Sequence, residues 1–357
     1  MRRKIMFIVP SLRGGGAEKV MVTLLKHINR QKFEVLLVLL TIEGEYMNQV
    51  PPDVRIIDLG TNRVRHSLFS LYKIIGKEKP DIVFSTQGHL NLGVIALKPF
   101  IGKDIKIVVR EANTLSELIK YSSKRWMWIF IYKNLYKKAD LVICQSNYML
   151  QDLIKHFKLP TQKLVQVYNP VDFENICYFA NRDENPFKGK ETLNIVSIGR
   201  LSHQKGYDRL IRSFPQLLEL KPEATLWIIG KGPLNEELVQ IRDELGLTDK
   251  VYFKDFQENP YKWLKHADLF VLSSYYEGLP NILLEAIACS CPVIALHHPG
   301  GTHEIMEITN QLERYIPDFD WKESWFNRPD VDCKELLFEE FNVERVVNKY
   351  EKIFENL

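Results

Sequence analysis

The sequence has few of the features that mark secreted, metal-binding or membrane-spanning proteins. Its five cysteines form no C-x-x-C pair and no cluster with histidine, which argues against a disulfide framework and a zinc site. No apolar run approaches the roughly 20 residues that cross a bilayer. The first apolar run, Ile5 to Val9, ends at Pro10 and is too short for the core of a signal peptide. We therefore expect a reduced, cytoplasmic protein.

The net charge of +3 conceals two halves of opposite sign. Residues 1–175 contain 27 Lys and Arg against 15 Asp and Glu, a balance of +12, whereas the remainder contains 21 against 30, a balance of −9. A chain of 357 residues is long enough for two domains, and halves of opposite charge indicate different partners for them. The basic half favours an anionic surface, which leaves a membrane, a nucleic acid or a phosphorylated substrate as candidates.

Short β-rich runs alternate with amphipathic helical patterns along both halves. Examples are KIMFIV, DIVFST and KIVVRE in the first half and LNIVSIG, ATLWIIG and DLFVLSS in the second. Apolar strands joined by helical crossovers predict parallel sheets covered on both faces, so we predict an α/β protein with two Rossmann-like, doubly wound domains. The expected bounds are 1–172 and 173–340, followed by a C-terminal helix at 341–357.

Ligands of open parallel sheets bind beyond the carboxyl ends of the strands, so the loops after the predicted strands are candidate sites. In PSLRGGGAEKV, three glycines precede a helix with Glu18 in its first turn. Glycines let backbone N–H groups approach a ligand, and helix N-termini favour anions, although a plain strand–helix turn fits these residues equally well. The stretch contains neither G-x-G-x-x-G nor the Lys-Ser/Thr ending of a P-loop.

Two further loops lie in the second half. IGRLSHQKGYDRL places Arg200 and Lys205 between Gly199 and a helix, and two fixed cations beside such a loop suit a diphosphate. A solvated basic loop is the alternative. In IIGKGPLNEEL, Gly230 precedes another helix, but a turn of this kind is common.

The fourth loop, YYEGLPNILLE, combines two carboxylates with a helix start. Pro280 and Asn281 mark the beginning of the helix, Glu277 precedes them, and Glu285 lies about one turn inside. Backbone N–H groups at this start suit a phosphate, and ionised carboxylates accept hydrogen bonds from sugar hydroxyls. An ordinary strand–helix turn with two solvated carboxylates is the alternative.

Together the four stretches, in this order and spacing, resemble glycosyltransferase family 4. EGLPNILLE matches the E-x7-E motif of retaining glycosyltransferases, and GRLSHQKGYDRL, IGKGP and GGGAE supply the rest. The resemblance covers roughly residues 4–305 and the final helix. It implies the GT-B fold: two Rossmann-like domains face a central cleft, the first binds the acceptor, the second binds the nucleotide-sugar, and the C-terminal helix crosses back to the first.

The resemblance also implies roles for individual residues. Arg200 and Lys205 correspond to the cations that hold the donor diphosphate, Glu277 to the carboxylate facing the transferred sugar, and Glu285 to the one that bonds the ribose. We treat Glu277, Arg200 and Lys205 as catalytic. Backbone contacts to the substrates are expected at the glycine-rich and helix-start positions, which are Gly15, Gly16, Gly199, Gly230, Leu279, Pro280 and Asn281.

Several positions depart from the family pattern. Many members carry a histidine after the strand written here KIVVRE, where this chain has Arg110 and Glu111, and we take these two as substrate-binding candidates. His89, after another strand, is a substitute candidate, although a lone loop histidine is more often structural. Two Asp-x-Asp triplets, at 318–320 and 330–332, lie in a divergent tail without a preceding strand. We expect solvated carboxylates there and no metal, with Arg200 and Lys205 replacing it.

The function implied is transfer of a hexose or N-acetylhexosamine from a nucleotide-sugar to a glycan with retention of configuration. A UDP-sugar is the expected donor and GDP-mannose the second candidate. The expected acceptor is a lipid-linked oligosaccharide of polysaccharide, lipopolysaccharide or glycoprotein biosynthesis. A sugar-nucleotide epimerase or phosphorylase on the same fold, and a non-catalytic sugar- or nucleic-acid-binding protein, remain alternatives. No nucleic-acid motif appears, so we expect no nucleic-acid partner.

One segment suggests where the acceptor resides. Residues 116–140 predict a single basic, aromatic helix with Trp126, Trp128 and Phe130 in its middle. Tryptophan suits the membrane interface, and lysine and arginine suit anionic headgroups, so we predict peripheral binding at the inner face of the plasma membrane. The alternative is a helix whose apolar face is buried against the first sheet.

Overall fold

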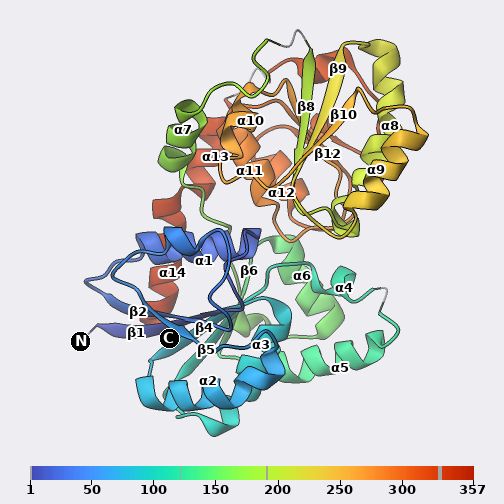
Figure 1. Ribbon diagram of the computed structural model, residues 1–357. Helices are drawn as coiled ribbons and strands as arrows, with labels where there is room; N and C mark the ends of the chain where they lie inside the picture. Colours follow the sequence, from blue (N-terminus) through green and yellow to red (C-terminus); the bar gives the residue numbers. More distant parts are fainter. Residues whose placement is uncertain (1, 121, 190–191, 329–331) are drawn as a thin grey trace. The chain divides into compact units, whose positions relative to one another are not determined.

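The computed structural model describes residues 2–120, 122–189, 192–328 and 332–357 (Figure 1). The chain forms two compact units. The first comprises residues 1–170 and 343–357, and the second comprises residues 171–342.

The first unit contains a seven-stranded sheet in the order β3-β2-β1-β4-β5-β6-β7, and its strand pairs are parallel. The chain order reverses between β1 and β4. Its strands are apolar because helices cover both faces of the sheet. They are β1 (Arg3–Val9), β2 (Phe33–Leu39), β3 (Arg55–Asp58), β4 (Ile82–Thr86), β5 (Lys106–Arg110), β6 (Leu141–Cys144) and β7 (Leu164–Gln166).

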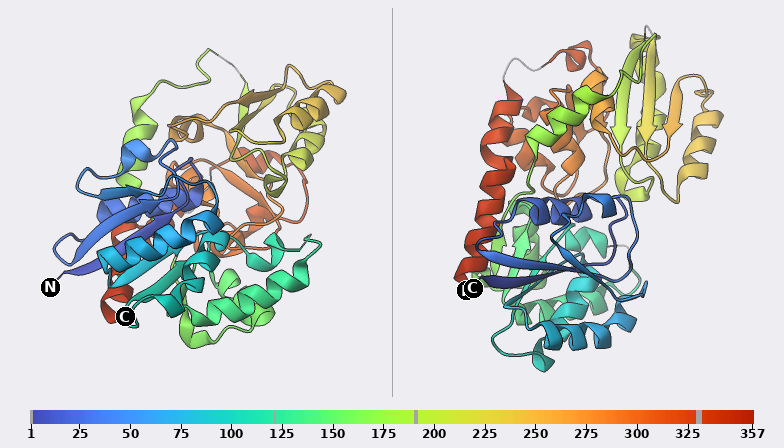
Figure 2. Two further views of the ribbon diagram at one scale, coloured as in Figure 1. Left: turned by 60° about the horizontal axis from the view of Figure 1, so that its bottom comes forward. Right: turned by 60° about the vertical axis from the view of Figure 1, so that its left-hand side comes forward.

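Helices divide between the two faces of this sheet (Figure 2). Side chains of α1 and α14 form one core with the strands, and those of α2, α3, α5 and α6 form the other. The α-helices of this unit are α1 (Gly16–His27), α2 (Val64–Glu78), α3 (Gly88–Ala96), α4 (Leu115–Leu118), α5 (Arg125–Leu135), α6 (Asn147–Phe157) and α14 (Val343–Asn356). The 3-10 helices are η1 (Met47–Gln49), η2 (Lys98–Phe100), η3 (Tyr136–Lys138) and η4 (Thr161–Lys163).

The second unit contains a six-stranded parallel sheet in the order β10-β9-β8-β11-β12-β13, which reverses between β8 and β11. Its strands are β8 (Leu193–Ile198), β9 (Ala224–Ile229), β10 (Val251–Lys254), β11 (Leu269–Leu272), β12 (Val293–Leu296) and β13 (Tyr315–Ile316). Its helices are α7 (Phe173–Arg182), η5 (His203–Lys205), α8 (Tyr207–Leu220), α9 (Asn235–Glu244), α10 (Tyr261–His266), α11 (Asn281–Ala288), α12 (Thr302–Ile308), η6 (Leu312–Arg314), η7 (Glu323–Phe326) and α13 (Cys333–Phe341).

Both sheets confirm the predicted class, α/β with two doubly wound Rossmann-like domains. The reversal of strand order in each sheet is the feature that matters for function. At such a point the loops after two neighbouring strands diverge to opposite faces, which leaves a crevice at the carboxyl edge where ligands of this class of sheet bind.

The predicted single helix over residues 116–140 is wrong. Helix α4 ends at Leu118, α5 begins only at Arg125, and η3 follows α5. The Ser122 hydroxyl accepts a hydrogen bond from the Lys124 amide at 3.3 Å, and the Ser122 carbonyl accepts one from the Arg125 amide at 3.0 Å. Serine side chains compete in this way with helical backbone bonds, so the described part of this segment turns where helical periodicity predicted continuity. Residue 121 lies outside the described residues.

Candidate active site

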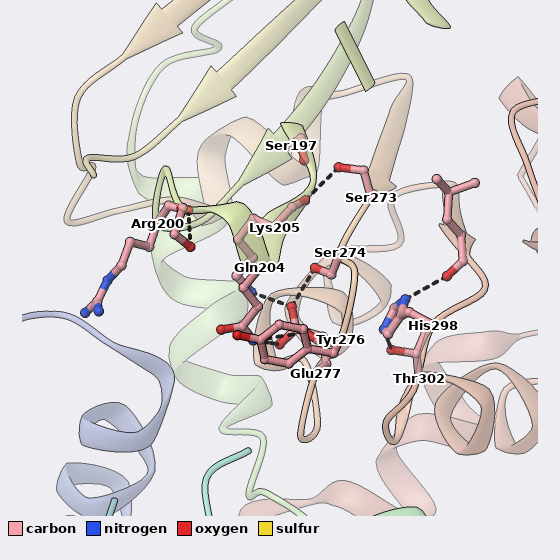
Figure 3. Close-up of polar contacts among 12 residues, drawn as sticks. Ser197, Arg200, Gln204, Lys205, Ser273, Ser274, Tyr276, Glu277, His298 and Thr302 are labelled. Carbon is pink, nitrogen blue, oxygen red and sulfur yellow. Dashed lines mark hydrogen bonds and ion pairs between the residues drawn. The ribbon is translucent and has the colours of Figure 1, made fainter. Parts of the chain in front are cut away.

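The loops after β8 and β11, at the reversal point of the second sheet, are joined by an ion pair. The Lys205 ammonium, at the end of η5, lies 2.6 Å from a carboxylate oxygen of Glu277 (Figure 3). These residues are two of the three predicted as catalytic. The fold therefore brings them together at the place where an open parallel sheet binds its ligand.

The Glu277 carboxylate is held by further donors. The Ser274 hydroxyl donates to Oε1 at 2.6 Å, and the Gln204 side-chain amide donates to Oε2 at 3.3 Å. Glu277 is only 5% exposed. Since a buried carboxylate is costly unless it is paired and hydrogen-bonded, this set of partners fixes its orientation.

The two loops also contact each other through their backbones. Gly206 has φ 61°, and a Cβ atom there would lie 2.1 Å from the Ser273 carbonyl oxygen, so only glycine fits. The Ser273 hydroxyl donates to the Lys205 carbonyl at 2.9 Å, and Arg209 Nε donates to the Ser273 carbonyl at 2.7 Å. The loop that carries Lys205 is thereby fastened to the loop that carries Glu277.

A third loop, after β12, also forms a hydrogen bond with Glu277. The Glu277 amide donates to the Pro299 carbonyl at 3.0 Å. His298 is buried next to this proline, and burial lowers its pKa to about 4, so the ring is neutral at pH 7. The neutral ring places its Nδ1 2.7 Å from the Leu296 carbonyl, to which it donates, and its Nε2 accepts from the Thr302 hydroxyl at 2.7 Å.

Arg200 differs from Lys205 in its surroundings. It is exposed, and within the described part of the chain its guanidinium forms no ion pair. Its side chain points away from the Lys205–Glu277 pair (Figure 3). The structure therefore does not place Arg200 beside Glu277. Gly199 and Gly230 lie just after the adjacent strands β8 and β9.

The turn after Glu277 leads into α11. Pro280 is the N-cap residue, Asn281 is the first helical residue, and Leu279 is buried in the preceding turn. Glu285 is also buried and lies on the second turn of α11. The predicted loop residues therefore form one continuous strand–turn–helix unit, and the helix N-terminus lies three residues beyond Glu277.

In the first unit, Gly15 is the N-cap residue of α1, and Gly16 is its first helical residue. His89 lies in the first turn of α3, where its exposed ring stands edge-on to Trp128 at 5.3 Å between centroids. These three predicted positions therefore lie at the carboxyl ends of β1 and β4, which are neighbours in the sheet.

Arg110 and Glu111, predicted as substrate-binding, are buried within the first unit. Arg110 donates to Asn169 Oδ1 at 2.5 Å. The Glu111 carboxylate accepts hydrogen bonds from the Tyr136 hydroxyl and from Asn91 Nδ2, the latter at 3.0 Å. Burial raises the pKa of Glu111 to about 7. Both side chains belong to an interior network in this structure, and a substrate contact at either stays a prediction.

No group of metal-ligating side chains was found within residues 2–120, 122–189, 192–328 and 332–357. Asp318 and Asp320 are exposed, and Asp320 pairs with Lys322 at 3.1 Å. Asp332 caps α13 by accepting from the Glu335 amide. The other two residues of the second triplet lie outside the described residues.

Three polar residues of the site escaped prediction: Gln204, Ser274 and His298. Ser274 ends the run DLFVLSS, and a hydroxyl after an apolar strand is a usable signal, although small polar residues are common there. Gln204 carries no local signal, because its contact is with Glu277, 73 positions away. A lone histidine such as His298 is not distinguished in the sequence from one with a purely structural role.

The fold and this site define a class: a GT-B enzyme with a cationic and carboxylate site in its second Rossmann-like unit. Two family models match the chain. "Glycosyltransferase Family 4" matches residues 14–175, and "Glycosyl transferases group 1" matches residues 179–312. The chain belongs to glycosyltransferase family 4, which confirms the resemblance, and it is a glycosyltransferase.

Individual relatives agree with this assignment. The chain is 28% identical to the Campylobacter jejuni N-acetylgalactosamine-N,N'-diacetylbacillosaminyl-diphospho-undecaprenol 4-alpha-N-acetylgalactosaminyltransferase, over 98% of this chain and 99% of that protein. It is 34% identical to an uncharacterized glycosyltransferase of Methanocaldococcus jannaschii, over 67% of this chain and 61% of that protein.

Solved structures show the same fold. Anabaena HepE in complex with UDP and glucose has a TM-score of 0.80 at 18% identity, covering all of both chains. Sucrose-phosphate synthase from Thermosynechococcus elongatus has a TM-score of 0.78 at 16% identity, covering 99% of each. The GT-B fold is thereby confirmed.

Proposed function

We propose that the protein is a retaining, metal-independent transferase that moves a hexose or N-acetylhexosamine from a UDP-sugar to a lipid-linked glycan. The observation that carries this proposal is the Lys205–Glu277 pair at the reversal point of the second sheet. The choice of UDP is supported by HepE, which was solved with UDP and with UDP-glucose. GDP-mannose is the second candidate donor.

Electrostatic stabilisation of the leaving group is the proposed mechanism. The diphosphate gains negative charge as the bond to the sugar breaks, and fixed positive groups aimed at it lower the barrier. Lys205, Arg200 and the N-terminus of α11 supply that charge, in the place of a metal ion. Glu277 accepts hydrogen bonds from hydroxyls of the transferred sugar, and Glu285 from the ribose. We assign no protein nucleophile, since attack from the face that the diphosphate leaves retains configuration without one.

The proposed acceptor follows from the Campylobacter relative, whose name specifies a sugar carried on diphospho-undecaprenol. That protein aligns with nearly the whole chain, so a related carrier fits this one. The reaction would then belong to the assembly of a surface polysaccharide, a lipopolysaccharide or a glycoprotein glycan.

Helix α5 supports peripheral binding at the inner face of the plasma membrane, where such a carrier is presented. Trp126 and Phe130 lie one turn apart and are 75% and 65% exposed, and Lys124 and Arg125 are exposed beside them. Tyr132 lies in the core. The membrane interpretation and the buried-face alternative therefore each describe one side of this helix. Within the described ranges, no helix is long and apolar enough to cross a bilayer.

Turnover of a panel of nucleotide-sugars tests the proposal. The protein is incubated with UDP- and GDP-sugars and a polyprenyl-diphosphate-linked disaccharide, and nucleotide release and product mass are followed. We expect UDP release that depends on the acceptor. Release of an altered sugar nucleotide without acceptor would instead identify an epimerase, and consumption of free phosphate a phosphorylase. Salt-sensitive nucleic-acid binding unaffected by UDP would favour a non-catalytic protein.

A further inference from the structure

The reversal point of the first sheet, between β1 and β4, is also spanned by a polar pair. Gln87 follows β4, and its side-chain amide donates to Glu18 Oε1, on α1, at 2.9 Å. Lys205 and Glu277 join the corresponding two loops of the second sheet. Because the crevice at a reversal point is where such sheets bind ligands, the Glu18–Gln87 pair lies where a ligand of the first unit is expected.

Gln87 has an unusual backbone conformation, with φ 77° and ψ 123°. Among the described residues, the other non-glycine residues with positive φ follow the ends of helices, where a left-handed residue is an ordinary terminator; they are Lys79, Lys158, Ser290 and Asn310. Gln87 instead lies between a strand and the start of a helix. Unfavourable conformations of this kind persist where the surroundings impose them, and they are concentrated at functional sites.

Glu18 faces the glycine-rich loop as well as Gln87. A Cβ atom added to Gly15 would lie 2.3 Å from Glu18 Oε2, so the carboxylate reaches back across the N-terminus of α1. Its Oε1 is the acceptor for Gln87. One carboxylate thus touches the loops after both β1 and β4, and it is almost fully buried.

An aromatic contact begins two residues after Gln87. His89 is exposed two residues after Gln87, and its ring stands edge-on to Trp128. A carboxylate, an amide and aromatic rings together match the chemistry of a pyranose, which presents hydroxyl or acetamido groups at its rim and C–H groups on its face.

We propose that Glu18 and Gln87 bind the acceptor sugar and set its specificity, with His89 as the outer wall of this subsite. The inference rests on the proposed function, because only a transferase has an acceptor. In this arrangement Glu18 accepts a hydrogen bond from an acceptor hydroxyl, and the Gln87 amide contacts a neighbouring hydroxyl or acetamido group.

Gln87→Gly and Glu18→Gln test the assignment. Glycine accepts the φ of residue 87 without strain, which partly offsets the loss of the hydrogen bond to Glu18, so Gln87→Gly should keep its fold by circular dichroism. If the amide binds the acceptor, its loss should nevertheless raise the acceptor KM about tenfold or more, with the KM for the nucleotide-sugar unchanged within twofold. Glu18→Gln should likewise raise the acceptor KM and leave the KM for the nucleotide-sugar unchanged.

Lys79→Gly is the matched control, because it removes a positive-φ side chain at the end of α2, which precedes β4 and not its carboxyl end. It should change neither KM. A Gln87→Gly variant that folds and keeps its acceptor KM within twofold would overturn the proposal, and so would equal rises in both KM values. Either outcome would show that the Glu18–Gln87 pair has only a structural role.

Binding of an acceptor analogue separates this inference from the proposed function. Saturation-transfer NMR with methyl α-N-acetylgalactosaminide needs no turnover. A signal in the wild type that is lost in Gln87→Gly supports the subsite, even if no lipid-linked acceptor is used and the proposed function fails. Equal signals in both proteins would overturn the subsite while leaving the proposed function standing.

Discussion

Lys205 and Glu277, 72 positions apart in the chain, meet at 2.6 Å between ammonium and carboxylate. Ser274 and Gln204 also donate to the carboxylate, so neither charge is buried without a partner. This relationship has consequences for both stability and turnover, because removing one member leaves the other in a partly dehydrated site.

Replacing either member of the pair should abolish most transfer. For Glu277→Gln and Lys205→Ala, we expect turnover to fall about 100- to 1,000-fold, by analogy with the loss of one group that stabilises transition-state charge. Circular dichroism should show an intact fold. Lys322→Ala is the matched control, because it breaks an exposed pair with Asp320 and should leave turnover unchanged. Near-normal turnover in either site variant would remove that residue from the mechanism.

Arg200→Ala should weaken nucleotide binding without destabilising the protein. The guanidinium is exposed and forms no ion pair with the described residues, so its removal leaves no buried charge behind. Loss of one charge-assisted contact to the diphosphate should lower UDP affinity about tenfold, as measured by calorimetry. Arg200→Lys should restore part of that affinity. Unchanged UDP affinity in the alanine variant would show that Arg200 does not reach the diphosphate.

Transfer should persist in excess EDTA. The proposed mechanism assigns the charge of the diphosphate to Lys205, Arg200 and the N-terminus of α11, which need no metal ion. The measurement is nucleotide release before and after dialysis against the chelator. Loss of activity that Mn²⁺ or Mg²⁺ restores would contradict this mechanism and direct attention to the carboxylates of residues 318–320.

The protein should float with anionic vesicles and not with neutral ones. Several basic side chains near an anionic surface give binding that weakens as the salt concentration rises, and exposed tryptophan adds affinity for the membrane interface. We expect binding to drop when Lys124, Arg125, Lys137 and Lys138 become glutamine, and when Trp126 becomes alanine. Tyr178→Ala, at another exposed aromatic residue, is the matched control. Equal flotation with neutral vesicles, or none with anionic ones, would make a soluble acceptor the better interpretation.

Glu111 should make the stability of the protein depend on pH. Its pKa in the folded protein is about 7, above the ordinary value of 4.5, because the carboxyl is buried. The folded state therefore binds more protons than the unfolded state between these values, and this contribution to stability is lost as pH rises through that window. His298, with its pKa lowered to about 4, acts in the opposite sense, so the two effects partly cancel in the wild type.

The variant Glu111→Gln isolates the effect, because glutamine mimics the protonated carboxyl. The melting temperature of Glu111→Gln minus that of the wild type should be larger at pH 7.5 than at pH 5. Parallel melting profiles of the two proteins across this range would show that the Glu111 carboxyl does not titrate there.

Local patterns in the sequence were sufficient for the strands, several helices and the loops that carry the site. Helix α8 illustrates this, because its apolar spacing, the glycine before it and its acidic first turn are all local properties of the sequence. The prediction of one helix over 116–140 followed the aromatic periodicity and gave no weight to the serines at 122 and 123. It was wrong because the chain turns at these serines.

By itself, the sequence determined the family, the α/β class and the motifs around Lys205 and Glu277. Only the tertiary structure decided which of these side chains meet. The Gln204–Glu277 contact, the interior position of Arg110 and the Glu18–Gln87 pair depend on contacts between segments distant in the chain. Periodicity predicts which residues of one segment face the core and which face solvent. The reversal of strand order brings separate loops together, and no local pattern in the sequence predicts those contacts.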